Sequence, residues 1–183
     1  MIYHFSLQSV AVVTGIILLL LGLTGLILPS AAQSRAKRLP RSFVAGVVLL
    51  TIDLARSLWL IGTMEMGEFQ AFRRPLLIAL PVGYFLVLRF VDEFLSVRAL
   101  GILCLLAAEP LLDAAFLRDE RARLVITTFA YLLIVAGILW VTMPYLMRDQ
   151  IDWGARSSLR WRFIHGLAVV YGALALVLAI MVY

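Results

Sequence analysis

The sequence contains no asparagine, a single cysteine, a single lysine and two histidines among its 183 residues. Without asparagine there is no N-glycosylation sequon. With Cys104 alone, neither an intramolecular disulfide nor a thiolate metal cluster can form within the chain. The histidines, His4 and His165, do not belong to the Glu-x-x-His pairs that build di-metal sites in helix bundles. We therefore expect no metal and no other cofactor.

Catalytic motifs are missing as well. The chain has no Gly-x-Ser-x-Gly turn of a serine hydrolase and no glycine-rich loop that would hold a phosphate. A membrane enzyme acting on lipid would need polar side chains to converge at one interface, and Asp92, Glu93, Arg98 and His165 are the residues available for this. The sequence otherwise gives no support for enzymatic activity.

Apolar residues are abundant instead. They make up 63% of the chain, and the mean hydropathy is +1.02, whereas a soluble domain is about 45–50% apolar. About 20 apolar residues suffice to cross a bilayer as a helix, and backbone groups in lipid must be bonded within such helices. The sequence predicts an all-α membrane helix bundle forming one domain over residues 1–183, with short loops and six spans, at about 9–28, 42–62, 75–91, 96–117, 124–147 and 163–183.

Basic residues between these segments predict the orientation. Nine lie on one side, at Arg35, Lys37, Arg38, Arg41, Arg98, Arg148, Arg156, Arg160 and Arg162, against five on the other, at Arg73, Arg74, Arg118, Arg121 and Arg123. The positive-inside rule then places both termini outside, and we expect a bacterial inner (cytoplasmic) membrane protein. The same rule accounts for the net charge of +5 without nucleic-acid binding.

A polar break separates the third and fourth segments, with four charged residues at its inner interface: Arg89, Asp92, Glu93 and Arg98. No glycine or proline marks a turn between Gly83 and Gly101. We expect a tight hairpin at Phe94–Ser96, with a short interfacial helix as the alternative.

Two charges fall inside the second segment. Asp53 and Arg56 are three residues apart and therefore lie on one helical face. A charge at the bilayer centre costs at least about 2.5–3.5 kcal/mol on insertion scales. We interpret the two as an ion pair within the helix that lowers this cost, or else as part of a substrate, ion or proton site.

The fourth segment carries two acids, Glu109 and Asp113, four residues apart on one face. Glu109 has no basic residue within a turn of its own helix, and it lies in the outer half of its span, as Arg56 does. A contact between Glu109 and Arg56 of the neighbouring span is geometrically possible. Asp53, Arg56, Glu109 and Asp113 thus form a predicted intramembrane polar network.

Other residues suggest lipid and helix contacts. Arg156, Arg160 and Arg162 surround Trp161 at the inner interface, where they could hold anionic lipid headgroups, and Trp161 itself fits an interfacial aromatic belt. Small residues at helical spacing on the first span (Gly15 and Gly22) and on the sixth (Gly172, Ala175 and Ala179) suggest that each makes close helix contacts.

These features favour a non-catalytic integral membrane protein, an accessory or scaffold subunit of a membrane complex. Its partners would be the lipid bilayer and other membrane protein subunits. The alternative is a small ion- or proton-coupled transporter with a midplane site of Asp53, Arg56 and Glu109.

Overall fold

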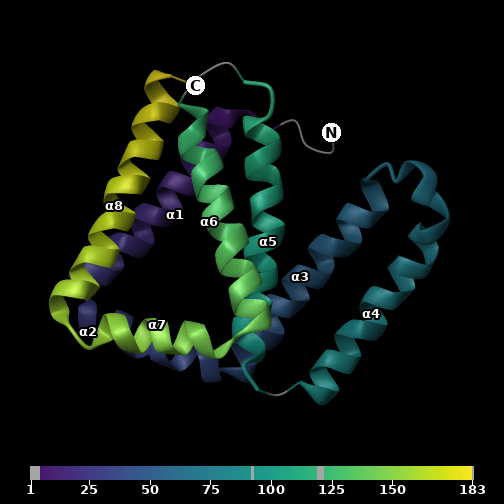
Figure 1. The fold of residues 1–183 in the computed structure, drawn as a ribbon, viewed down its shortest axis with the longest axis horizontal. Coiled ribbons are helices and arrows are strands. Elements are labelled where there is room, and N and C mark those ends of the chain that lie inside the picture. Colours follow the sequence, from purple (N-terminus) through teal and green to yellow (C-terminus); the bar gives the residue numbers. More distant parts are fainter. Residues whose placement is uncertain (1–4, 92, 119–121, 183) are drawn as a thin grey trace.

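The chain folds into eight α-helices and two short 3₁₀ helices in the computed structural model, which describes residues 5–91, 93–118 and 122–182. Six α-helices are long and apolar enough to cross a membrane, as predicted. In one of the six segments, Gly67–Phe90, a 3₁₀ helix continues directly into the α-helix. The six α-helices are α1 (Leu7–Ile27), α3 (Phe43–Thr63), α4 (Arg73–Phe90), α5 (Leu95–Ala115), α6 (Arg123–Thr142) and α8 (Ser158–Met181). The two described ends of the chain lie at the same end of the bundle (Figure 1).

The predicted short loops are wrong in two places, because helices occupy the connections. The first is α2 (Pro29–Arg38), followed by the 3₁₀ turn η1 (Leu39–Arg41); the second is α7 (Tyr145–Ala155). Pro29 stands at the first position of α2, where its missing N–H costs nothing. Pro144 stands one position earlier, at the N-cap of α7, and the fifth span ends at Thr142 and not at 147 as predicted.

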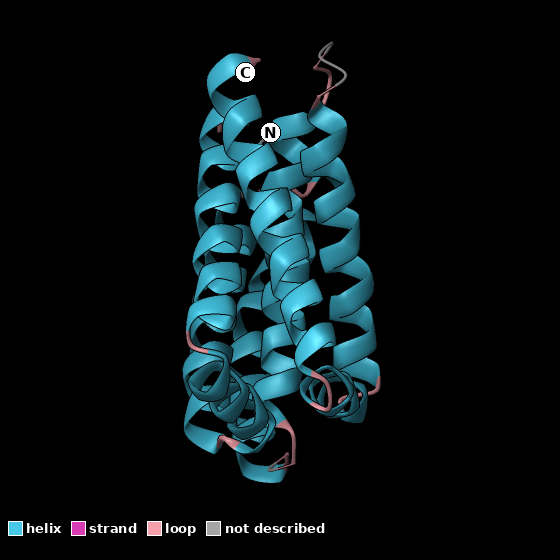
Figure 2. Cartoon of the chain, turned by 90° about the vertical axis from the view of Figure 1, so that its left-hand side faces the viewer, coloured by secondary structure: helices cyan, strands magenta, loops and turns pink. Residues whose placement is uncertain are grey.

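Both short helices lie at the bundle end opposite the termini. α7 runs across the long helices in Figure 1, and helices at this end appear nearly end-on after a rotation by 90° in Figure 2. A second 3₁₀ helix, η2 (Gly67–Phe72), joins α3 to α4 at the termini end, and the side chain of Arg73 donates a hydrogen bond to the carbonyl of Met64 across this connection.

Glycines hold α1 and α8 in close contact. A Cβ added to Gly172 would lie 2.9 Å from the carbonyl oxygen of Gly15, and one added to Gly22 would lie 2.8 Å from that of His165. Ala175 and Ala179 on the same face of α8 are fully buried. The predicted close helix contacts of these small residues are confirmed, and the structure shows that α1 and α8 make them with one another. The indole N–H of Trp161 also donates a 2.9 Å hydrogen bond to the Gly25 carbonyl.

A second pair, α5 and α6, is packed in the same manner. Gly101 and Gly137 face one another, and a Cβ on either would come within 2.9 Å of the other's carbonyl oxygen. The two pairs join near the termini through a cluster of small and branched residues: Leu7, Ala11, Ala108, Leu111, Ala115, Ile126, Ala130, Ala175 and Ala179. Tyr171 of α8 adds a 2.5 Å hydrogen bond to the Val125 carbonyl of α6.

The α3–α4 hairpin is attached differently. α3 contacts α5 near its own start, where a Cβ on Gly46 would lie 2.8 Å from the Ser96 amide nitrogen, but nothing lies within 4 Å of such an atom on Gly62. The hairpin accordingly leans away from α5 towards the termini end (Figure 1). α4 has no buried residue. The side-chain hydroxyls of Thr51 on α3 and Tyr84 on α4 form a 2.9 Å hydrogen bond between the two helices.

α4 ends at Phe90 and α5 begins at Leu95, and Phe94 before it lies at φ +55° in the left-handed region. The turn is tight, as expected, but lies earlier than predicted. Ser96 belongs to the first turn of α5, where its hydroxyl donates a 2.6 Å hydrogen bond to the Leu39 carbonyl of η1.

Candidate functional site

One face of α3 brings the predicted polar residues against α5. Gly46, Leu50 and Asp53 are spaced by four and three residues, and all three are buried. They therefore define the contact face, because residues at this spacing share one side of a helix. α3 and α5 run in the same direction, so residues at equal distance from their starts lie at one level (Figure 1).

Arg56 and Glu109 meet across these two helices. Arg56 Nη2 lies 3.7 Å from Glu109 Oε2, and 30% and 42% of the two side chains are exposed. The guanidinium also lies 5.8 Å from the ring centre of Trp59, one turn further along α3. At 1.5 Å rise per residue, both charges lie about 10 Å inside the ends of their helices. A partly exposed ion pair therefore sits well within the apolar length of the bundle, where the two helices diverge.

Asp53 does not form the predicted ion pair with Arg56. Its side chain is 3% exposed, and neither carboxylate oxygen accepts a hydrogen bond from any residue that the structure describes. The helical spacing permits a pair within α3, but a carboxylate at the same level on α5 takes the guanidinium instead. The Asp53 carboxyl group is thus buried and does not take part in the Arg56–Glu109 ion pair.

Asp113 lies one turn beyond Glu109 on α5 and is half-buried. Among the described residues, its side chain has neither a hydrogen bond nor an ion pair. The four-residue network predicted from sequence is therefore reduced to one ion pair between helices and two acids outside it.

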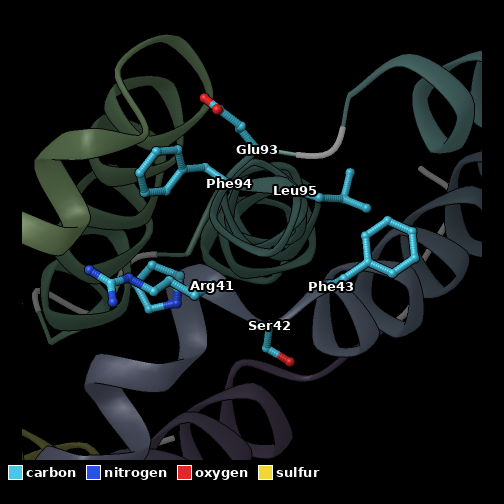
Figure 3. A pocket seen from close by; sticks show the side chains of 7 residues that line it. Arg41, Ser42, Phe43, Glu93, Phe94 and Leu95 are labelled. Carbon is cyan, nitrogen blue, oxygen red and sulfur yellow. The ribbon is translucent and has the colours of Figure 1, made fainter.

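The predicted inner-interface charge cluster is not brought together as ion pairs within the described part of the chain. Arg89 and Glu93 are exposed and Arg98 is half-buried, while Asp92 lies outside the described residues. A cavity of about 280 Å³ opens between Glu93 and Arg41 of η1. These two side chains point apart, with Phe94 between them in this view (Figure 3), so charge does not converge there.

Arg156, Arg160 and Arg162 are all exposed at the junction of α7 and α8. The Arg160 guanidinium lies 4.7 Å from the ring centre of Trp153, which ties the start of α8 to α7. Trp161, predicted to sit in an interfacial belt, is only 6% exposed. Its bond to Gly25 draws it between α1 and α8, so the belt assignment is wrong for this residue.

His165 is packed inside the same α1–α8 contact. Its ring lies against Gly25 and stacks on Trp161 at 4.3 Å between ring centres. Glu93, in contrast, belongs to the turn before α5. No described contact joins the two, so His165 and Glu93 do not converge within the described part of the chain. Among the described residues, no three His, Cys, Asp or Glu side chains are placed to hold a metal ion.

Sequence reasoning missed a basic cavity beside η1. A space of about 520 Å³ is lined by five residues with cationic or hydroxyl side chains: Ser34, Lys37, Arg38, Arg41 and Ser42. A smaller space of about 130 Å³ next to it adds Arg148 and Asp152 of α7. From the sequence, Lys37, Arg38 and Arg41 predict only the orientation of the protein in the membrane. The signal that could have revealed the cavity is Pro29, which turns the chain into α2.

Comparisons of the chain with protein-family models, with curated proteins and with solved structures find no match.

Proposed function

We propose that this protein is a non-catalytic accessory or scaffold subunit of a membrane complex, and that it binds a helix of another membrane protein between α3 and α5. The single observation that carries this proposal is the Arg56–Glu109 pair, which is partly exposed although it lies within the apolar length of the bundle. Ionisable residues inside a membrane almost always face a protein interior or a water-filled cavity. A partner helix in this position would provide that interior.

The shape of the hairpin supports the same proposal. α3 and α5 touch at Gly46 and diverge beyond it (Figure 1): nothing lies within 4 Å of a Cβ added to Gly62, and Trp59 is 46% exposed. α4, with no buried residue, leaves the hairpin without a helix packed on its outer side among the described elements. Glycine contacts therefore hold α1 and α8 tightly together, whereas the α3–α4 hairpin is loosely packed on the rest of the bundle.

The chemistry of the site indicates what kind of helix would fit. Arg56 and Glu109 already neutralise one another, so a charged partner residue would leave an excess charge in lipid. A mostly apolar helix carrying a hydroxyl or amide side chain would instead supply hydrogen bonds to the pair, in the way polar residues join helices in membranes. The occupant we propose is such a helix from a different subunit.

Location and orientation follow from the charge distribution. We place the protein in a bacterial inner membrane with both termini outside, because the basic residues are concentrated at the end that carries α2 and α7. A membrane-impermeant thiol reagent applied to intact cells would then label a Glu68→Cys variant and leave a Gln150→Cys variant unlabelled. The reverse pattern would contradict this orientation.

Photo-cross-linking tests the proposed docking position. A photoreactive phenylalanine analogue at Trp59 is expected to give one discrete adduct with a different polypeptide. The yield of this adduct should fall at least tenfold with Arg56→Glu, because the new carboxylate would repel that of Glu109. The control position is Tyr131 on α6, which is 58% exposed against 46% for Trp59. Adducts with a second copy of the chain, with lipid only, or in equal yield from both positions would refute the proposal.

A second candidate function, a proton-coupled carrier, is favoured by Asp53 alone. A buried carboxyl without a hydrogen-bond partner is costly, and such intramembrane acids often belong to proton relays. Its position near the middle of α3 places it at the depth where carriers bind their coupling ions. The Arg56–Glu109 pair would then line the outer side of the path.

Proton flux in liposomes tests the carrier. If Asp53 carries protons, the reconstituted protein should acidify liposomes under an imposed potential faster than empty liposomes do, and Asp53→Asn should reduce this flux at least tenfold. Asp113→Asn, which alters another acid without a described partner, is the control and should leave the flux unchanged. A protein-dependent flux that is unaffected by Asp53→Asn would contradict the proton-carrying role of Asp53.

A further inference from the structure

The cavity beside η1 combines three cations with two hydroxyls and no acid. Its lining residues are Ser34, Lys37 and Arg38 of α2, Arg41 of η1, and Ser42 at the start of α3. Glu93 and Asp152 line the neighbouring spaces, to which Arg41 also contributes, and not this one. Within the described part of the chain, no ion pair joins Lys37, Arg38 or Arg41 to a carboxylate. The positive charge in this cavity is therefore available to an external anion.

The local fold explains why these cations gather. α2 has no buried residue, and its basic residues occupy the last turn, where the helix dipole favours positive charge. η1 then turns the chain back into α3, anchored by the buried Pro40 and by the Ser96 bond to Leu39. This turn brings Arg41 and Ser42 beside the end of α2. The cations are thus held by a fixed backbone even though their side chains are exposed.

The start of α3 adds a second feature suited to an anion. The Ser42 hydroxyl caps the helix by accepting a hydrogen bond from the Ala45 amide. The first amides of this 21-residue helix point towards the same end of the molecule as the cavity, and helix N-termini attract phosphate groups. Three cations, two hydroxyls and a helix start together match the chemistry of a phosphate.

Apolar surface next to the cavity points to a lipid as the source of that phosphate. Val44 and Val48 follow Ser42 along α3 and are 73% and 53% exposed. Acyl chains attached to a phosphate in the cavity would lie along these side chains. A free phosphate would make no use of them.

We infer that Lys37, Arg38 and Arg41, with Ser34 and Ser42, form a binding site for the phosphate of an anionic diacyl phospholipid. This site is distinct from the α7–α8 arginines suggested by sequence and lies apart from the proposed docking position on α3. Each basic residue near an anionic lipid surface contributes about fivefold in affinity, so removing all three cations should weaken binding on the order of a hundredfold.

Binding of a fluorescent phosphatidylglycerol to the delipidated full-length protein in neutral detergent tests the site. The variant K37Q/R38Q/R41Q should bind on the order of a hundredfold more weakly, and Arg41→Gln alone about fivefold more weakly. The matched control, R156Q/R160Q/R162Q, removes the same charge from the same end of the molecule and should change binding less than threefold. Phosphatidylcholine should not compete, and inorganic phosphate should compete only weakly.

Three results would overturn the inference. Equal losses in the two triple variants would show that general surface charge binds the lipid. Full competition by inorganic phosphate would assign the site to a free anion. Equal binding of phosphatidylcholine would show that the acyl chains alone are recognised. Size-exclusion chromatography of each variant verifies that the exposed substitutions leave the fold intact.

Discussion

Replacing Gly172 by leucine is expected to destabilise the protein by about 3 kcal/mol, because the new side chain must force α8 away from α1. A Cβ at this position would lie 2.9 Å from both the Gly15 carbonyl oxygen and the Leu19 amide nitrogen. Backbone atoms cannot rotate aside as side chains do, so the whole helix has to shift. The contacts of the buried Ala175 and Ala179 would be lost with it.

Thermal unfolding in mild detergent measures this effect. For a chain of this size, the expected loss corresponds to a fall in Tm of roughly 6–12 °C. Gly166→Leu is the matched control on the same helix, because a Cβ there would have nothing within 4 Å. Equal shifts for the two variants would mean that α1 and α8 are not packed through Gly172.

The second large effect concerns the Arg56–Glu109 pair. Arg56→Gln and Glu109→Gln each leave one charge without its partner inside the apolar length of the bundle. Breaking a fully buried pair costs about 3–5 kcal/mol, and with 30% and 42% of the side chains exposed we expect about 1–2 kcal/mol for each variant. The double variant R56Q/E109Q should recover at least about 1 kcal/mol relative to the sum of the two.

A double-mutant cycle on unfolding free energies in detergent gives this coupling directly. The reference pair is Arg148–Asp149, at 3.0 Å but 45% and 54% exposed, for which we expect a coupling below about 0.5 kcal/mol. Additive losses at Arg56 and Glu109, within about 0.3 kcal/mol, would mean that the two residues do not interact in the folded protein.

Hydropathy and small residues predicted most of the fold. Twenty-residue apolar runs determine six of the eight α-helices, and the glycines of α1 and α8 identify their contact face because only small residues allow backbones to approach so closely. The two short helices escaped prediction. A hydropathy window treats Pro29 and Pro144 as the ends of spans, whereas each proline also permits a new helix to begin in a different direction.

The polar residues were predictable in identity and partly in pairing: the possible contact between Arg56 and Glu109 is confirmed, whereas the ion pair of Asp53 with Arg56 is not formed. Spacing places Asp53 and Arg56 on one face of α3, yet the partner of Arg56 depends on the register of α3 against α5. That register is determined by the close approach of Gly46 to Ser96, a contact between residues 50 positions apart. Local periodicity carries no information about such a contact, and among the described residues the predicted pair of Asp53 with Arg56 is not formed.

The mass of the particle extracted from its native membrane, with surrounding lipid retained, tests the proposed scaffold role most directly. The chain alone weighs 20.4 kDa. A scaffold subunit predicts a particle that contains a second, different polypeptide, and predicts that this polypeptide is lost with Arg56→Glu while the variant itself stays folded. A particle whose protein mass is only one or more copies of this chain, unchanged by Arg56→Glu, would contradict the account.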